Sequence, residues 1–130
     1  MTTPLIRSRA EEMIRRIKRF SSPAFKKQMA DRFGICTDKA LGTPVTTLRV
    51  LVKGLPRPDQ ELADALWESG IHEARIMASM LADPAQMTRQ KLDAWAQDLN
   101  SWDICDLCAG NLFAKVKNPF KLAEHWIKRE

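Results

Sequence analysis

The chain has 130 residues, of which 45% are hydrophobic and 28% are charged, and its formal net charge is +5. This size fits one domain with a buried core, and the chain shows neither an apolar run of ~20 residues that could cross a membrane nor the apolar region of a signal peptide. Its three cysteines, an odd number, fit a reducing compartment better than a secreted fold stabilised by disulfide bonds, so we expect a cytoplasmic protein.

Residues that typically begin or end helices recur through the first half of the chain, and no convincing strand pattern lies between them. The first predicted helix spans about residues 4–20, and the next runs from Pro23 to a stop at Gly34. A third helix begins near Pro44, because proline at an early helical position loses no hydrogen bond, and it ends at Gly54.

The second half continues with five more predicted helices. Asp59 caps the first of them, Gly70 separates it from the next, Thr88 starts another, and the last two are a helix from Trp102 to about Ala114 and one from Asn118 to the end. From Pro44 onward, helix pairs recur about every 35–45 residues, the period of HEAT-like repeats. We therefore expect an all-α fold of about eight short helices, a HEAT-like α-α superhelix that forms one domain over residues 1–130. A plain helical bundle is the alternative.

Positive charge is concentrated in the first half of the chain. Residues 1–60 hold 13 Lys and Arg against 5 Asp and Glu, whereas residues 61–130 hold 8 against 11. The excess gathers in the first two predicted helices, at Arg15, Arg16, Lys18, Arg19, Lys26 and Lys27. Such a patch suits a polyanion, with nucleic acid as the first candidate, and Arg15, Arg16 and Lys18 are predicted contacts. A solvated helix face is an equally good interpretation.

The segment around Trp102 carries the strongest chemical signal. Ser101 is placed to cap a helix, and Trp102 and Asp106 are four residues apart, so they share one helix face. An electron-rich ring beside a fixed anion is a good receptor for a flat cation. On spacing alone a structural interpretation is the commoner one, with a packed indole and an acid that compensates the helix dipole.

Two further clusters give weaker signals. Cys105 and Cys108 form C-x-x-C, but the second half of a zinc site is missing, so we interpret them as small buried residues and predict no metal or cofactor. Arg75, near a helix start, either contacts a phosphate or forms an ion pair between helices, and the latter is the commoner case. His72 in the same segment is a second candidate DNA contact.

Several segments together resemble the DNA alkylation repair (AlkD-like) glycosylase family. They are LADALWESGIHEAR at 62–75, ADP at 82–84, NSWDICD at 100–106 and, more loosely, TPVTTLR at 43–49. The resemblance covers about residues 40–130, and the strings LWESGIHEAR and SWDICD are fairly specific together.

The resemblance implies a HEAT-like solenoid that holds duplex DNA on its concave face. It implies hydrolysis of the N-glycosidic bond of N3- and N7-alkylated purines, without a metal or other cofactor. Carried over by position, Trp102 would contact the deoxyribose and cationic base of the lesion, and Asp106 would be the essential carboxylate. Such a carboxylate would stabilise the positive charge that develops on the sugar and would orient the attacking water.

Members of this family are nearly twice as long as this chain. We therefore expect a chain truncated within the solenoid, and an uncapped repeat end of that kind favours self-association. Two functions of other classes stay open beside a glycosylase, since a helical repeat does not by itself indicate an enzyme. They are a non-catalytic DNA-binding module and a protein-interaction scaffold.

Overall fold

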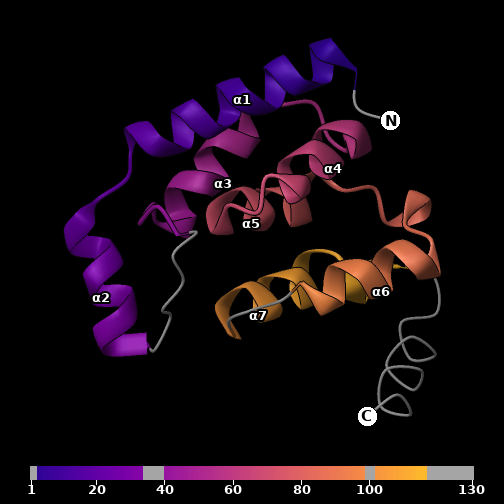
Figure 1. The fold of residues 1–130 in the computed structure, drawn as a ribbon. Helices are drawn as coiled ribbons and strands as arrows, with labels where there is room; N and C mark the ends of the chain where they lie inside the picture. The colour runs from indigo at the N-terminus through magenta and orange to yellow at the C-terminus, as the bar shows by residue number, and fades with distance from the viewer. Residues whose placement is uncertain (1–2, 34–39, 99–101, 117–130) are drawn as a thin grey trace.

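A computed structural model describes residues 3–33, 40–98 and 102–116, and it describes side chains throughout these ranges except at 32–33 and 102–106 (Figure 1). The described part of the chain is all-helical. Its elements are α1 (Pro4–Arg19), α2 (Pro23–Phe33), α3 (Val45–Lys53), α4 (Gln60–Glu68), α5 (His72–Leu81), α6 (Arg89–Gln97) and α7 (Trp102–Asn111), with 3₁₀ turns η1 (Pro84–Gln86) and η2 (Phe113–Lys115). The predicted all-α class is confirmed, and the helix predicted from Asn118 onward lies outside the described residues.

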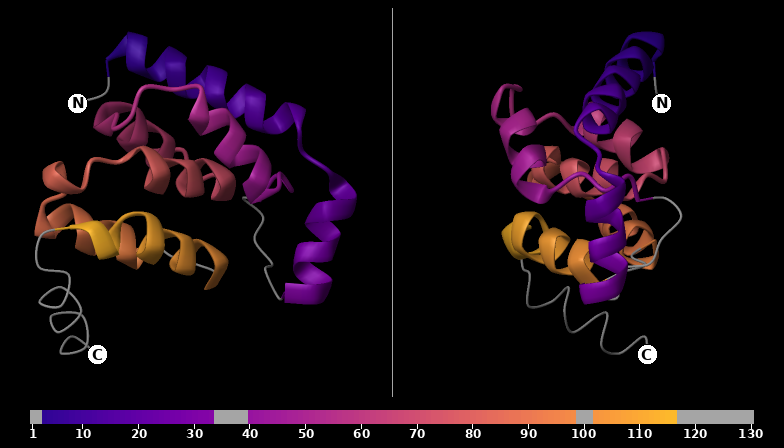
Figure 2. Two further views of the ribbon diagram at one scale, coloured as in Figure 1. Left: turned by 180° about the vertical axis from the view of Figure 1, so that it is seen from behind. Right: turned by 90° about the vertical axis from the view of Figure 1, so that its left-hand side faces the viewer.

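The helices form two layers (Figure 2). One layer contains α1, α4 and α6, and the other contains α3, α5 and α7, with α4 and α5 packed against each other across the layers. A short turn reverses the chain between α4 and α5, so that they form the kind of helix pair from which helical repeats are built. This arrangement is consistent with the expected HEAT-like fold.

The central element is α5, which contacts α3 and α7 in its own layer and α4 and α1 in the other. Eight of its ten residues are buried. Five of the buried residues are apolar, and they are Ala74, Ile76, Met77, Ala78 and Leu81, whereas His72, Glu73 and Ser79 are buried polar residues. A helix buried on most sides is less amphipathic than one with an exposed face such as α1. The main core cluster of the protein therefore surrounds this helix.

Helix starts follow local capping rules. Thr3, Asp59 and Thr88 each accept a hydrogen bond from the amide three residues further on, at 3.1–3.2 Å. Such caps satisfy amide groups that the first helical turn leaves without partners. The Asp59 cap and a helix start at Thr88 are those that the sequence predicted.

Two helix boundaries differ from the prediction. Pro44 is the residue before α3 rather than a member of it, and the helix begins at Val45. The helix that starts at Trp102 ends at Asn111 instead of near Ala114, because Leu112 leaves the helical conformation with φ −129° and ψ −60°. The chain then turns through η2, which brings Lys115 back toward the body of the protein.

A buried carboxylate holds the loop that precedes α3. Glu73, on α5, is 1% exposed and accepts hydrogen bonds from the amides of Leu41, Gly42 and Thr43 at 2.8, 2.9 and 3.2 Å. The Thr43 hydroxyl in turn donates to the Ile17 carbonyl on α1 at 2.8 Å. These bonds join three segments of the chain and set where α3 begins.

Candidate nucleic-acid interface

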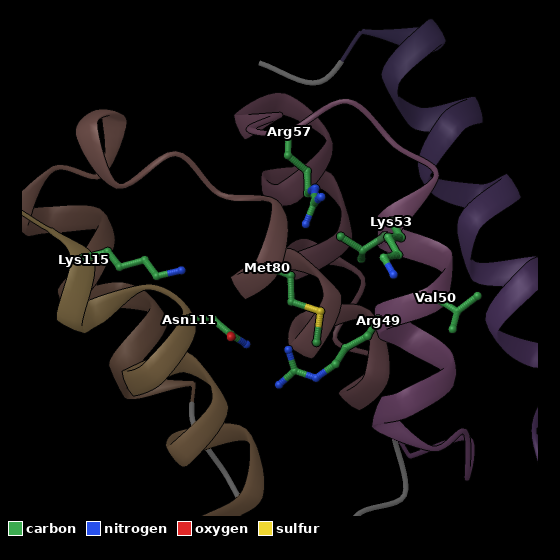
Figure 3. A pocket seen from close by; sticks show the side chains of 8 residues that line it. Arg49, Val50, Lys53, Arg57, Met80, Asn111 and Lys115 are labelled. Atoms are coloured by element: carbon green, nitrogen blue, oxygen red, sulfur yellow. The ribbon is translucent and has the colours of Figure 1, made fainter.

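A depression of about 410 Å³ opens on the layer of α3, α5 and α7 (Figure 3). Its walls come from α3, from the turn after α3, from the end of α5 and from the end of α7 with η2. The lining residues are Arg49, Val50, Val52, Lys53, Arg57, Met80, Asn111 and Lys115. Figure 3 shows Arg49, Arg57 and Lys115 extending toward the space around Met80, with Val50 at its edge.

The side chains that line this depression carry positive charge. Four of its lining side chains, Arg49, Lys53, Arg57 and Lys115, are cationic, and none of the lining residues whose side chains the structure describes is acidic. All four are exposed, and none forms an ion pair within the part of the chain that the structure describes. Clustered cations without partners raise the local potential and attract anions.

Two features determine the positions of the four cations: the spacing of residues along α3, and the packing of α3, α5 and α7 side by side in one layer. Arg49 and Lys53 are four residues apart and share one face of α3, whereas Leu48 on another face is buried in the core. Lys115 is brought beside them because α5 packs against both α3 and α7. The sequence analysis missed this cluster, although the spacing of Arg49 and Lys53 was a usable signal.

The floor of the depression combines an apolar and a neutral polar group. Met80 supplies a thioether, and Asn111 lies beside it. The Asn111 side-chain amide donates to the Ser79 hydroxyl at 3.3 Å, and that hydroxyl donates to the Ile76 carbonyl at 2.6 Å. This chain of hydrogen bonds holds the Asn111 amide in one orientation beside Met80.

The cations predicted as DNA contacts on α1 lie elsewhere and are partly compensated. Arg15 and Arg16 pair with Glu12 at 2.7 and 3.7 Å. The hydrogen bond from Arg15, together with its charge, lowers the pKa of the Glu12 carboxyl, and Arg16 adds to the effect. Lys18 is exposed on the same helix. None of these three cations lines the depression, so their role as DNA contacts stays a prediction.

Arg75 and His72, the other predicted contacts, lie on α5 away from the depression. The Arg75 guanidinium lies 5.1 Å from the Trp67 ring centroid, donates to the Trp67 carbonyl at 3.0 Å and faces the Asp98 carboxylate at 3.8 Å. These contacts favour the interhelical ion pair over a phosphate contact. His72 is 2% exposed, which places it in the protein interior.

The backbone of Trp102 and Asp106 lies in α7, as predicted, but their side chains lie outside the described part of the structure. Helical spacing continues their face to Ala109 and Gly110, and both of these residues are exposed. Cys108 is buried on another side of the helix. Where the structure is described, no three His, Cys, Asp or Glu residues are grouped as metal ligands would be, and no helix is long and apolar enough to span a membrane.

The described part of the chain thus combines helix pairs in two layers with a group of cations around one depression. The family model described as DNA alkylation repair enzyme matches residues 13–130, so the chain belongs to this family. The resemblance seen in the sequence is thereby confirmed, and DNA repair with DNA as substrate or partner follows from it. Searches of curated proteins and of solved structures gave no significant match.

Proposed function

We propose that this protein excises cationic N3- and N7-alkylated purines from duplex DNA by hydrolysing the N-glycosidic bond. The observation that carries the proposal is the family match, which spans Trp102 and Asp106. Two features of the structure support it: the backbone of both residues lies in α7 on a face that is exposed further along the helix, and the same helical layer bears the positive depression.

The proposed chemistry needs one carboxylate and one aromatic ring. An alkylated purine of this kind already carries positive charge, so it departs without being protonated. As it leaves, positive charge develops on the sugar, and Asp106 would stabilise that charge and orient the attacking water. Trp102 would hold the cationic base and sugar through its ring face and exclude solvent.

The test is base release from a duplex that carries N7-methylguanine, measured by mass spectrometry. Asp106→Asn is expected to lower the rate by about 10²-fold or more, because it removes the preorganised anion, while binding of the duplex persists. Asp103→Asn is the matched control: it removes another carboxylate from α7, one to which no role in the reaction is assigned, and release should continue. Retained release in Asp106→Asn would refute the assigned role.

A non-catalytic DNA-binding module is the second candidate. The positive depression favours it because a cationic surface is sufficient for DNA binding, whereas excision also requires a catalytic carboxylate. It predicts salt-sensitive DNA binding with no base release by the unaltered chain. The same assay therefore separates the two functions. Release that depends on Asp106 supports the glycosylase, and binding without release supports the module.

A further inference from the structure

We infer that a groove beside α1 binds a short segment of a partner protein in which a large apolar side chain is flanked by acidic residues. The inference goes beyond the proposed action on DNA and concerns another surface of the protein. The groove lies between one side of α1, the turn after α3 and the first turn of α4, and it shares no lining residue with the depression around Met80.

The inner wall of the groove is apolar. Met13 on α1 and Leu62 on α4 are 4% and 1% exposed, and Leu55, in the turn between α3 and α4, is partly buried. The open volume is about 310 Å³, near the lower end of the range found for ligand pockets. A space of this kind accepts a large apolar side chain, and removing that side chain from water favours its binding.

Charged side chains of α1 lie at the edge of the groove, where solvent reaches them. Arg9 and Arg16 are seven residues apart, about two helical turns, with Glu12 between them on the same side of α1. Asp59 holds Arg9 at 2.8 Å, whereas Arg16 lies 3.7 Å from Glu12, which is too far for a hydrogen bond. Glu12 instead accepts two hydrogen bonds from Arg15, at 2.7 and 3.2 Å. Of the two groove arginines, Arg16 is therefore the one that can donate to a carboxylate from outside.

The charge of α1 determines the sign of the partner. This helix carries six basic residues and two acidic ones, which are Arg7, Arg9, Arg15, Arg16, Lys18 and Arg19 against Glu11 and Glu12. A surplus of positive charge attracts carboxylates and repels basic segments. Acidic residues beside the apolar anchor would therefore pair with the groove edge at Arg16.

The apolar wall favours a protein segment over DNA as the occupant. Duplex DNA is also anionic, but its backbone offers no apolar side chain that could enter the groove. An apolar anchor held in a pocket with polar contacts around it is instead the common arrangement of protein–protein recognition. In addition, α1 lies at the end of the helical stack remote from α6 and α7 (Figure 1), so a partner bound here could stay bound while DNA occupies α7.

The experiment is fluorescence anisotropy of the whole chain with four labelled peptides. The first carries Leu-Phe between acidic residues, the second carries Ser-Ser between the same acidic residues, and the other two carry these centres between lysines. The acidic peptide with Leu-Phe is expected to bind about tenfold more tightly than each of the others. Equal binding of the two acidic peptides, tighter binding of a lysine peptide, or no binding of the first peptide would contradict the inference.

Two variants locate the binding site. Arg16→Glu is expected to weaken binding of the first peptide about tenfold, because it replaces attraction by repulsion at the groove edge. Leu55→Gln should weaken it by a similar factor, because it makes the inner wall polar. Far-UV circular dichroism shows whether each variant is folded, and Arg16→Glu, at an exposed position, gives a reading even where Leu55→Gln does not fold.

The matched control is Arg7→Glu, which makes the same change of charge on α1 at an exposed residue outside the groove. We expect it to retain near-normal affinity for the first peptide. Equal loss in Arg7→Glu and Arg16→Glu would mean that the charge of α1 alone matters, and this result overturns the inference.

Undamaged duplex DNA provides the last arm, added as a competitor at constant ionic strength. Peptide binding that persists in excess duplex supports a separate surface. If the duplex displaces the peptide and Arg16→Glu weakens both by the same factor, the groove belongs to DNA and the inference fails. No base release is measured in these titrations, so failure of the proposed excision would leave their result intact.

Discussion

Gly42 shows how one residue determines the path of the chain. It adopts φ +84°, its amide donates to Glu73 at 2.9 Å, and its carbonyl accepts from the Ser22 amide at 2.9 Å. A Cβ atom at this position would lie 2.5 Å from the Ser22 carbonyl oxygen and 2.9 Å from Lys26 Cβ. Glycine is therefore required here both by the positive φ and by the approach of α2.

Gly42→Ala is expected to lower the free energy of unfolding by about 1–3 kcal/mol, because both the backbone conformation and the close contact are disturbed. Urea denaturation followed by circular dichroism measures this value. Gly110→Ala is the control, since a Cβ there meets no atom within 4 Å and the residue is helical. It should be neutral or stabilise by up to about 1 kcal/mol, and a comparable loss in both variants would contradict the explanation.

At the scale of elements, an aromatic cluster connects α4, α5 and α6. The Trp67 and Trp95 rings are stacked with centroids 4.2 Å apart and planes 1° from parallel, and Arg75 lies over the Trp67 ring. The Trp67 ring nitrogen donates to the Asp98 carboxylate at 3.0 Å, and Asp98 also faces Arg75. One arginine thus contacts an indole, a main-chain carbonyl and a carboxylate from two neighbouring helical segments.

Arg75→Met should lower the free energy of unfolding by about 1–3 kcal/mol, through loss of the cation–π contact and of the partly buried hydrogen bond to the Trp67 carbonyl, without changing the DNA affinity of the folded protein. Urea denaturation and anisotropy measure the two effects separately. Arg89→Met, an exposed change at the start of α6, should leave both nearly unchanged. A weakened DNA affinity at unchanged stability would instead support Arg75 as a phosphate contact.

At the scale of the whole molecule, the central position of α5 predicts cooperative unfolding. Met77 on this helix is fully buried in the core cluster that includes residues of both layers. A helix packed against four others cannot separate from one of them without exposing apolar surface of the rest. The layers are therefore expected to unfold together.

Met77→Ala should cost about 2–5 kcal/mol of unfolding free energy, and the transitions seen by tryptophan fluorescence and by far-UV circular dichroism should shift together. Val50→Ala, at a side chain 69% exposed, is the control and should change stability by less than about 0.5 kcal/mol. Two separate transitions in Met77→Ala would show that the layers unfold independently.

Local features of the fold could be predicted because they depend on neighbouring residues. The capping role of Asp59 and the helix start at Thr88 were identified from the sequence, since a helix start and its cap lie within four residues. The contact of Glu73 with the amides around Gly42 could not be predicted, because 31 residues separate the two partners. Arg75 is an intermediate case. Its position near a helix start permitted both an ion pair and a phosphate contact, and only its packing against Trp67 favoured the ion pair.

The amino-acid sequence alone determined the all-helical class, the family and the candidate pair Trp102 and Asp106, because periodicity, capping and short strings of residues are local properties. The tertiary structure alone brought Arg49, Lys53, Arg57 and Lys115 together around one depression. The sequence pointed to α1, where Arg15 and Arg16 pair with Glu12. The depression instead combines residues of α3 and η2, which lie more than 60 residues apart in the sequence. They meet because α3, α5 and α7 pack side by side, and that packing depends on side-chain contacts between distant segments.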